Sequence, residues 1–107
     1  MQLNKEYIPV RECEYEISDG IVTVIFDKFE KSWLDKLIKP KKEKIAKIEL
    51  DDIGSFVWQN CDGKNNISDI IQLTEGKFSD KDKISERVQL FLTQLESKKL
   101  IRFYTIN

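Results

Sequence analysis

The stretch LDDIGSFVWQNCDGKNNISDII, residues 50–71, has the pattern of a helix, a tight turn and a second helix. Asp51 is placed to cap the first helix, since its carboxylate can accept free backbone N–H groups, and Asp52 lies near the positive end of the helix dipole. Gly63 supplies a left-handed turn residue and Asn66 a second cap. DNA-binding proteins use this helix-turn-helix, but fold alone does not fix function. The rest of the chain must therefore distinguish a DNA-binding protein from one of another kind.

Apolar residues at helical spacing predict three helices in the second half of the chain. The second helix is expected to end at Gly76 and Phe78. The third is expected to begin at Ser79 or Asp80 and to cover 82–99. The inward-facing residues are Ile53, Phe56, Val57 and Cys61 in the first helix, with Trp58 on its flank, then Ile67, Ile70 and Ile71 in the second, and Ile84, Val88, Phe91, Leu92 and Leu95 in the third.

The first half of the chain has strand patterns. Residues 12–17 alternate between glutamates and apolar residues, which predicts a half-buried strand. The turn SDG follows, and Gly20 can adopt the positive φ of a tight hairpin. Residues 21–26, IVTVIF, are apolar at nearly every position, so we expect a central strand covered on both faces. IAKIEL, residues 45–50, returns to alternation and predicts a third strand, and 100–104 can add a short terminal one.

Between these strands the sequence becomes basic. An apolar stripe near 29–38 predicts a helix that Pro40 stops. From Lys28 to Lys47 there are eight lysines and three acidic residues, a local charge of +5, although the whole chain carries −1. Such a run is compatible with a solvated face, with a docking surface for an acidic partner, or with nucleic-acid or membrane contact.

The predicted order is β-β-(α)-β-α-α-α, which indicates an α+β fold of the winged helix-turn-helix type with the wing placed first. A small N-terminal antiparallel sheet, 12–50, carries the inserted basic helix and is followed by a three-helix bundle and the short strand, 51–104. A length of 107 residues suits one domain, 1–107, with one modest core.

Catalytic and metal-binding groups are scarce. The chain has no histidine, and its two cysteines, Cys13 and Cys61, are far apart in sequence. No glycine-rich phosphate loop follows a strand. We therefore expect a protein that is not an enzyme and that needs no metal or cofactor. Both thiols are expected to be buried as small apolar groups.

The balance of charge and the apolar runs bear on localisation and partners. A net charge of −1 gives no general attraction to phosphate backbones, so nucleic acid is not an expected partner. No apolar run approaches the roughly 20 residues that span a bilayer. The N-terminal residues lack the apolar centre of a signal segment, and we expect a cytoplasmic protein.

Three segments in order, LDDIGSFVW, CDGKNNISDII and ERVQLFLTQLESKKLI, resemble the PqqD family, the peptide recognition element of ribosomal peptide modification systems. The resemblance covers 50–101, and the 27–44 segment is longer than the connection in typical small members. It implies a non-catalytic domain that binds the leader of a ribosomally made precursor peptide. Such a domain presents the peptide to a modifying enzyme, often of the radical S-adenosylmethionine class. The resemblance does not specify whether the product is pyrroloquinoline quinone.

The resemblance also implies where the peptide binds. In the family it lies as an extra strand against the third strand, and the third helix forms the other wall of the groove. Leu90 lies about 240° around that helix from Ile84, away from the core stripe, although another element could cover it. Carried over, the peptide-binding residues are Ile45, Ala46, Lys47, Ile48, Glu49 and Leu50 on the strand and Arg87, Leu90, Phe91, Gln94 and Lys98 on the helix.

Two other functions fit the same fold. A winged-helix DNA-binding regulator would need a basic recognition helix, but ISDIIQLTEG, 67–76, has no basic residue and 82–99 mixes both signs. A structural module that dimerises by exchanging N-terminal strands is the second alternative, and it would make the protein a homodimer.

Overall fold

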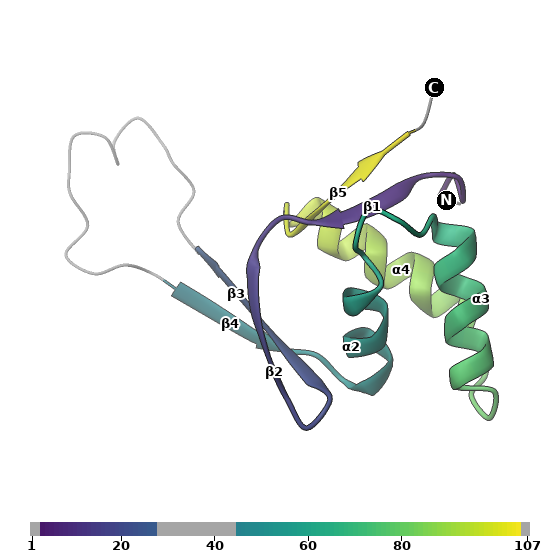
Figure 1. Ribbon diagram of the computed structural model, residues 1–107, viewed down its shortest axis with the longest axis horizontal. Helices are drawn as coiled ribbons and strands as arrows, with labels where there is room; N and C mark the ends of the chain where they lie inside the picture. Colours follow the sequence, from purple (N-terminus) through teal and green to yellow (C-terminus); the bar gives the residue numbers. More distant parts are fainter. Residues whose placement is uncertain (1–2, 28–44, 106–107) are drawn as a thin grey trace.

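The computed structural model describes residues 3–27 and 45–105 (Figure 1). This part of the chain is α+β, with a three-stranded antiparallel sheet, a two-stranded one and three helices. The helix expected near 29–38 lies outside the described residues. In chain order the elements are β1 Ile8–Arg11, β2 Glu14–Ser18, β3 Ile21–Asp27, β4 Ile45–Glu49, α2 Asp52–Gln59, α3 Ile67–Lys77, α4 Ile84–Ser97 and β5 Ile101–Tyr104.

The three-stranded sheet has the order β2-β3-β4 and is antiparallel throughout. Asp19 and Gly20 connect β2 to β3, and both have positive φ, 52° and 78°. This is the two-residue hairpin loop whose twist matches that of the flanking strands. The predicted hairpin and the central place of β3 are confirmed, and the first strand lies at 14–18 instead of 12–17.

The two faces of β3 differ in burial. Val22 and Val24 are fully buried on the face toward the helices. Thr23 and Ile25, on the opposite face, are only half-buried. The expectation that both faces are covered is therefore wrong. An antiparallel sheet can leave one face to solvent, and here the neighbouring outer-face residues include Glu16, which lies opposite Thr23.

A second, two-stranded sheet joins the two ends of the described chain. β1 pairs with β5 from Ile8↔Tyr104 to Arg11↔Ile101. The terminal strand was expected, but β1 was not, because IPVR is short and Pro9 interrupts it. Its strand conformation is supported by tertiary bonds: the Arg11 N–H donates to the Cys61 carbonyl at 3.0 Å.

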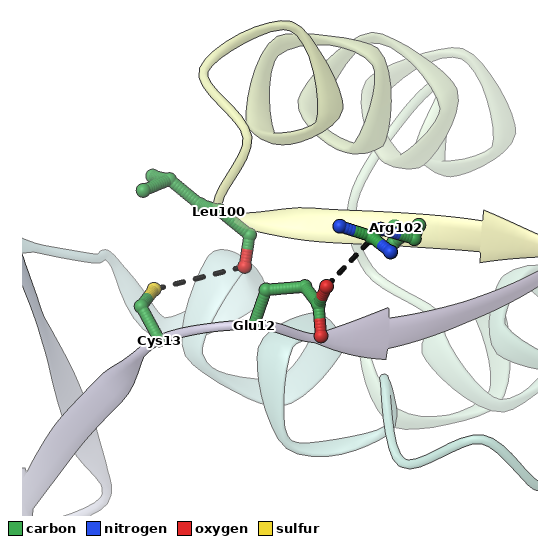
Figure 2. A network of polar contacts seen from close by, with 4 residues as sticks. All are labelled: Glu12, Cys13, Leu100 and Arg102. Atoms are coloured by element: carbon green, nitrogen blue, oxygen red, sulfur yellow. Dashed lines mark hydrogen bonds and ion pairs between the residues drawn. The ribbon is translucent and has the colours of Figure 1, made fainter. Parts of the chain in front are cut away.

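Beside this sheet the chain turns from β1 toward β2. Figure 2 shows that turn, where the Glu12 carboxylate contacts the Arg102 guanidinium at 3.1 Å and the Cys13 thiol lies 3.6 Å from the Leu100 carbonyl. The ion pair is well exposed, so it contributes little to stability.

Helix α2 begins as expected, because the Asp51 carboxylate accepts the Gly54 N–H at 2.7 Å. The helix ends at Gln59, and Gly63, with a φ of 83°, lies in the turn that follows. The helix contacts both β3 and α4 (Figure 1).

The inward face of α2 is rotated from the predicted stripe. Ile53 and Phe56 are only half-buried, whereas Gly54 and Ser55 face the interior. The placement of Trp58 on the flank is wrong, because it is fully buried. Because Gly54 and Ser55 are small, the sheet and α4 can approach α2 closely. The Trp58 indole is buried on the same helix.

Helix α3 has the predicted cap. The Asn66 side chain accepts the Asp69 N–H at 2.8 Å, and the Asp69 carboxylate accepts the Asn66 N–H at 3.1 Å, a reciprocal capping box. The predicted end is partly wrong, because the helix continues through Gly76 to Lys77 and Phe78 is its C-cap. The expected inward residues Ile67, Ile70 and Ile71 are buried.

Helix α4 is shorter than expected, with 14 residues from Ile84 to Ser97. It does not begin at Ser79 or Asp80. Lys83 precedes it in a left-handed conformation with a φ of 57° and gives no side-chain cap. The inward residues Ile84, Val88, Leu92 and Leu95 are buried, whereas Phe91 is half-buried.

The two cysteines are free and differ in exposure: Cys61 is buried and Cys13 is half-buried. The expectation of two buried thiols therefore holds fully only for Cys61. Burial raises the pKa of the Cys61 thiol from 9.0 to about 12, against a smaller opposing effect of the Arg11 charge. Burial also raises the pKa of Cys13, with Glu12 adding to the effect. Both thiols are thus protonated near neutral pH.

Replacing Ser55 with alanine is expected to lower the free energy of unfolding by about 1–3 kcal/mol. Ser55 is 1% exposed and its hydroxyl accepts the Val22 N–H at 2.8 Å, so removal of the hydroxyl leaves a buried donor without a partner. Urea denaturation measures the change. Ser79→Ala, at an exposed position, is the control, and equal stability of the two variants would contradict this role for Ser55.

A second prediction concerns alkaline pH. The folded pKa of Cys61 lies above its unfolded value, so its contribution to stability is complete below about pH 9 and is lost as pH rises toward 12. Cys61→Ala should therefore lose stability less steeply than the native chain between pH 9 and 11, by up to about 1.4 kcal/mol per pH unit. Cys13→Ala retains the Cys61 contribution and is the control. Parallel curves for the native chain and Cys61→Ala would contradict the assignment.

Candidate functional site

The edge of β4 is the first component of the site. Among the described residues, β4 pairs with β3 alone, in a register that sets Val24 opposite Ile48. The Leu50 N–H donates to the Val22 carbonyl at 2.8 Å. Since bonding alternates along an antiparallel ladder, Ala46, Ile48 and Leu50 bond toward β3. The backbone groups of Lys47 and Glu49 consequently face the free edge.

The same alternation divides the side chains of this strand between two faces. Leu50 is buried and Ile48 is half-buried against the core. Lys47 and Glu49 are exposed on the outer face. An added strand would therefore find unpaired backbone groups at two residues, each beside a charged side chain.

A crevice of about 110 Å³ lies between the start of α2 and the middle of α4. This volume equals that of three to four water molecules at roughly 30 Å³ each, which is enough for part of one aliphatic side chain. Gly54 keeps the crevice open, because a Cβ there would lie 3.3 Å from the Phe91 ring and 3.0 Å from the Asp51 carboxylate. The lining residues are Asp51, Ile53, Gly54, Val57, Arg87, Val88 and Phe91.

On α4, Leu90 is 61% exposed, so no element of residues 3–27 and 45–105 covers it. Leu90 and Arg87 line a shallow hollow with charged residues of the preceding turn. Arg87 and Phe91 line the crevice. Gln94 and Lys98 are exposed further along the helix and border neither the hollow nor the crevice. Of the predicted helix residues, Arg87, Leu90 and Phe91 therefore line the crevice or the hollow, whereas Gln94 and Lys98 line neither.

The strand and the helix of the predicted groove are linked through α2. The main neighbours of α4 are α3, β5 and α2, whereas that of β4 is β3. Because Leu50 and Asp51 connect β4 directly to α2, the crevice lies next to the end of the strand. Sequence reasoning missed the contribution of Ile53, Gly54 and Val57 to this site. A glycine inside an amphipathic helix was the available signal, because it often marks a close approach.

Two further properties concern only the part of the chain that the structure describes. No cluster of three or more histidine, cysteine, aspartate or glutamate side chains is placed to hold a metal ion there. None of the described helices is long and apolar enough to cross a membrane. The chemistry available at the edge and the crevice is hydrogen bonding by backbone groups, apolar contact and charge.

A pair of glycine substitutions tests the crevice. Gly76→Ala should stabilise the protein by about 0.5–1 kcal/mol, because Gly76 is inside α3 and nothing lies within 4 Å of an added Cβ. Gly54→Ala should lose this gain, since the new methyl group contacts Asp51 and Phe91. Thermal unfolding of both variants gives the comparison. An equal gain at both positions would show that the two helices are not in close contact at Gly54.

Comparison with known proteins identifies the family of this chain. The family model of coenzyme PQQ synthesis protein D, PqqD, matches residues 37–101, more than half of the 107-residue chain. The match includes β4, which provides the edge, α2 and α4, which line the crevice, and α3. No curated protein and no solved structure matched the chain. The resemblance seen in the sequence is confirmed, and the chain belongs to the PqqD family.

Proposed function

We propose that this protein is a non-catalytic adaptor that binds the leader of a ribosomally made precursor peptide and presents it to a modifying enzyme. Membership of the PqqD family supports peptide recognition and a place in the synthesis of coenzyme PQQ or of another modified peptide. The observation that carries the proposal is the free edge of β4 with a crevice at its end.

The leader adds to β4 as an antiparallel strand. Its backbone bonds to the outward N–H and C=O groups of Lys47 and Glu49, which supply affinity without sequence information. Alternate side chains of the added strand point to the inner face. The one nearest Leu50 enters the crevice between Gly54 and Phe91, so the crevice selects an apolar residue.

Helix α4 supplies the second surface of the groove. Leu90 offers an exposed apolar contact. Arg87, which lines both the crevice and the shallow hollow, offers the hydrogen-bond donors of its guanidinium. Gln94 and Lys98 contact a longer leader that continues along the helix. The receiving residues on the strand are those of β4, Ile45–Glu49, together with Leu50.

The remaining expectations fit this role. We propose one domain with a winged-helix arrangement, working in the cytoplasm with an enzyme of the radical S-adenosylmethionine class. DNA binding is disfavoured, because α3 has exposed acidic residues at Asp69 and Glu75 and a single lysine, Lys77. A homodimer remains the alternative for a structural module.

Replacing Lys47 with proline tests strand addition. Proline removes an N–H that faces the free edge and leaves the β3–β4 bonds intact. In titration calorimetry with a peptide selected for binding to the native chain, Lys47→Pro should bind about ten-fold more weakly than Lys47→Ala, the equivalent of one hydrogen bond. Lys47→Ala keeps the N–H and should remain within about five-fold of the native affinity, the value of one cross-strand charge pair. Equal affinities for the two variants would exclude β4 as the receiving edge.

Replacing Leu90 with aspartate tests the helix surface. Because Leu90 is 61% exposed, the free energy of unfolding of the protein should change little in Leu90→Asp. Affinity for the same peptide should fall roughly ten- to a hundred-fold, since burial of apolar surface is lost. Leu73→Asp, at a position on α3 that is 45% exposed, is the matched control and should bind normally. A similar loss for both variants would indicate a general effect of added charge.

A further inference from the structure

Lys47 and Glu49 have opposite charges at the free edge of the sheet. Toward β3 they lie opposite Ile25 and Thr23, neither of which is charged. In residues 3–27 and 45–105 the one ion pair joins Glu12 and Arg102, so neither charge is neutralised there. Both side chains are exposed. They are therefore available to a strand that adds on the other side of β4.

The register fixes what such a strand would place beside them. Residues opposite Lys47 and Glu49 form hydrogen-bonded pairs with β4, and their side chains lie on the same outer face. They are two positions apart in the added strand. The residue between them lies opposite Ile48 and points to the inner face. Directly opposed side chains have Cβ atoms about 4.5–5.5 Å apart, within reach of an ion pair.

We propose that Lys47 and Glu49 select a leader by the order of its charges, which rests on the adaptor function proposed above. In antiparallel addition the residue opposite Glu49 comes first and is basic, the next is apolar, and the residue opposite Lys47 is acidic. The motif from N- to C-terminus is thus basic, apolar, acidic. Parallel addition would require the reverse order, so the two charges also determine the direction of the bound strand.

The opposite edge of the sheet provides a contrast. On β2 the backbone groups of Tyr15 and Ile17 face outward, because the hairpin loop pairs Ser18 with Ile21. The outer-face charges beside them, Glu14 and Glu16, are both acidic. A strand added there would gain from basic residues in any order. Selection for a defined order of opposite charges is therefore specific to β4.

Selection from a displayed library of random 12-residue peptides tests the proposal. It is run on the native chain and on the K47E/E49K double variant, which has the same net charge. The control is K5E/E6K, in which two exposed neighbouring residues, far from β4 in the sequence, exchange charge. The native chain and the control should enrich basic-x-acidic peptides. The double variant should enrich the reverse order.

Synthetic peptides that differ only in this order give the magnitude. The native chain should prefer Lys-Leu-Glu over Glu-Leu-Lys by roughly three- to thirty-fold, the value of two cross-strand charge pairs, and K47E/E49K should reverse the preference. The preference should shrink in 0.5 M salt, because these charges are exposed.

The outcomes separate the two proposals. Peptides enriched without a charge order, or with the same order on the native chain and on K47E/E49K, would overturn the role of Lys47 and Glu49 and leave the adaptor function standing. Failure to enrich any peptide on the native chain, on K47E/E49K and on the control would overturn both.

Discussion

The buried hydroxyl of Ser55 joins three elements at one point. It accepts the Val22 N–H at 2.8 Å and lies 3.4 Å from the Leu50 carbonyl, where the last bond of the β3–β4 ladder would form. The hydroxyl therefore replaces a sheet bond with a bridge from α2. Because Leu50 directly follows β4 and Ser55 lies in the first turns of α2, this bridge fixes the edge of β4 relative to the crevice. Any groove between strand and helix depends on that fixed relation.

Small residues make the bridge possible, and a large one fills the space behind them. Gly54 and Ser55 allow Phe91 and β3 to approach α2, and Trp58 lies fully buried on the same helix with the Tyr15 ring edge-on at 5.8 Å. Within the described part of the chain the indole N–H has no hydrogen-bond partner, which carries a cost in free energy.

The two edges of the three-stranded sheet differ in a way that suits one binding site. Among residues 3–27 and 45–105 neither edge has a further pairing partner, and charged residues on an edge strand discourage unwanted pairing. On β2 the charges have one sign, so a second copy of this strand would be repelled. On β4 the charges alternate in sign, and a strand with the complementary order is attracted. The β2 edge thus repels a second copy of itself, whereas β4, which itself reads basic, apolar, acidic at 47–49, has the charge order of a strand that can add antiparallel to it.

The sequence by itself determined the features that depend on neighbouring residues. The caps at Asp51 and Asn66 and the hairpin at Gly20 follow from local hydrogen bonding and backbone conformation, and alternation identified β4. Helical periodicity correctly placed Leu90 away from the core. These interactions span few residues, so their signal is contained in a short segment.

Tertiary structure decided the rest. β1 forms a strand because β5 and the segment after α2 pair with it, and α2 rotates to bury Trp58 because two small residues let other elements approach. The crevice combines α2 with α4, and the outward direction of the Lys47 N–H depends on pairing with β3. Each of these features results from contact between segments distant in the chain, and a pattern within one segment does not specify which partner it will meet.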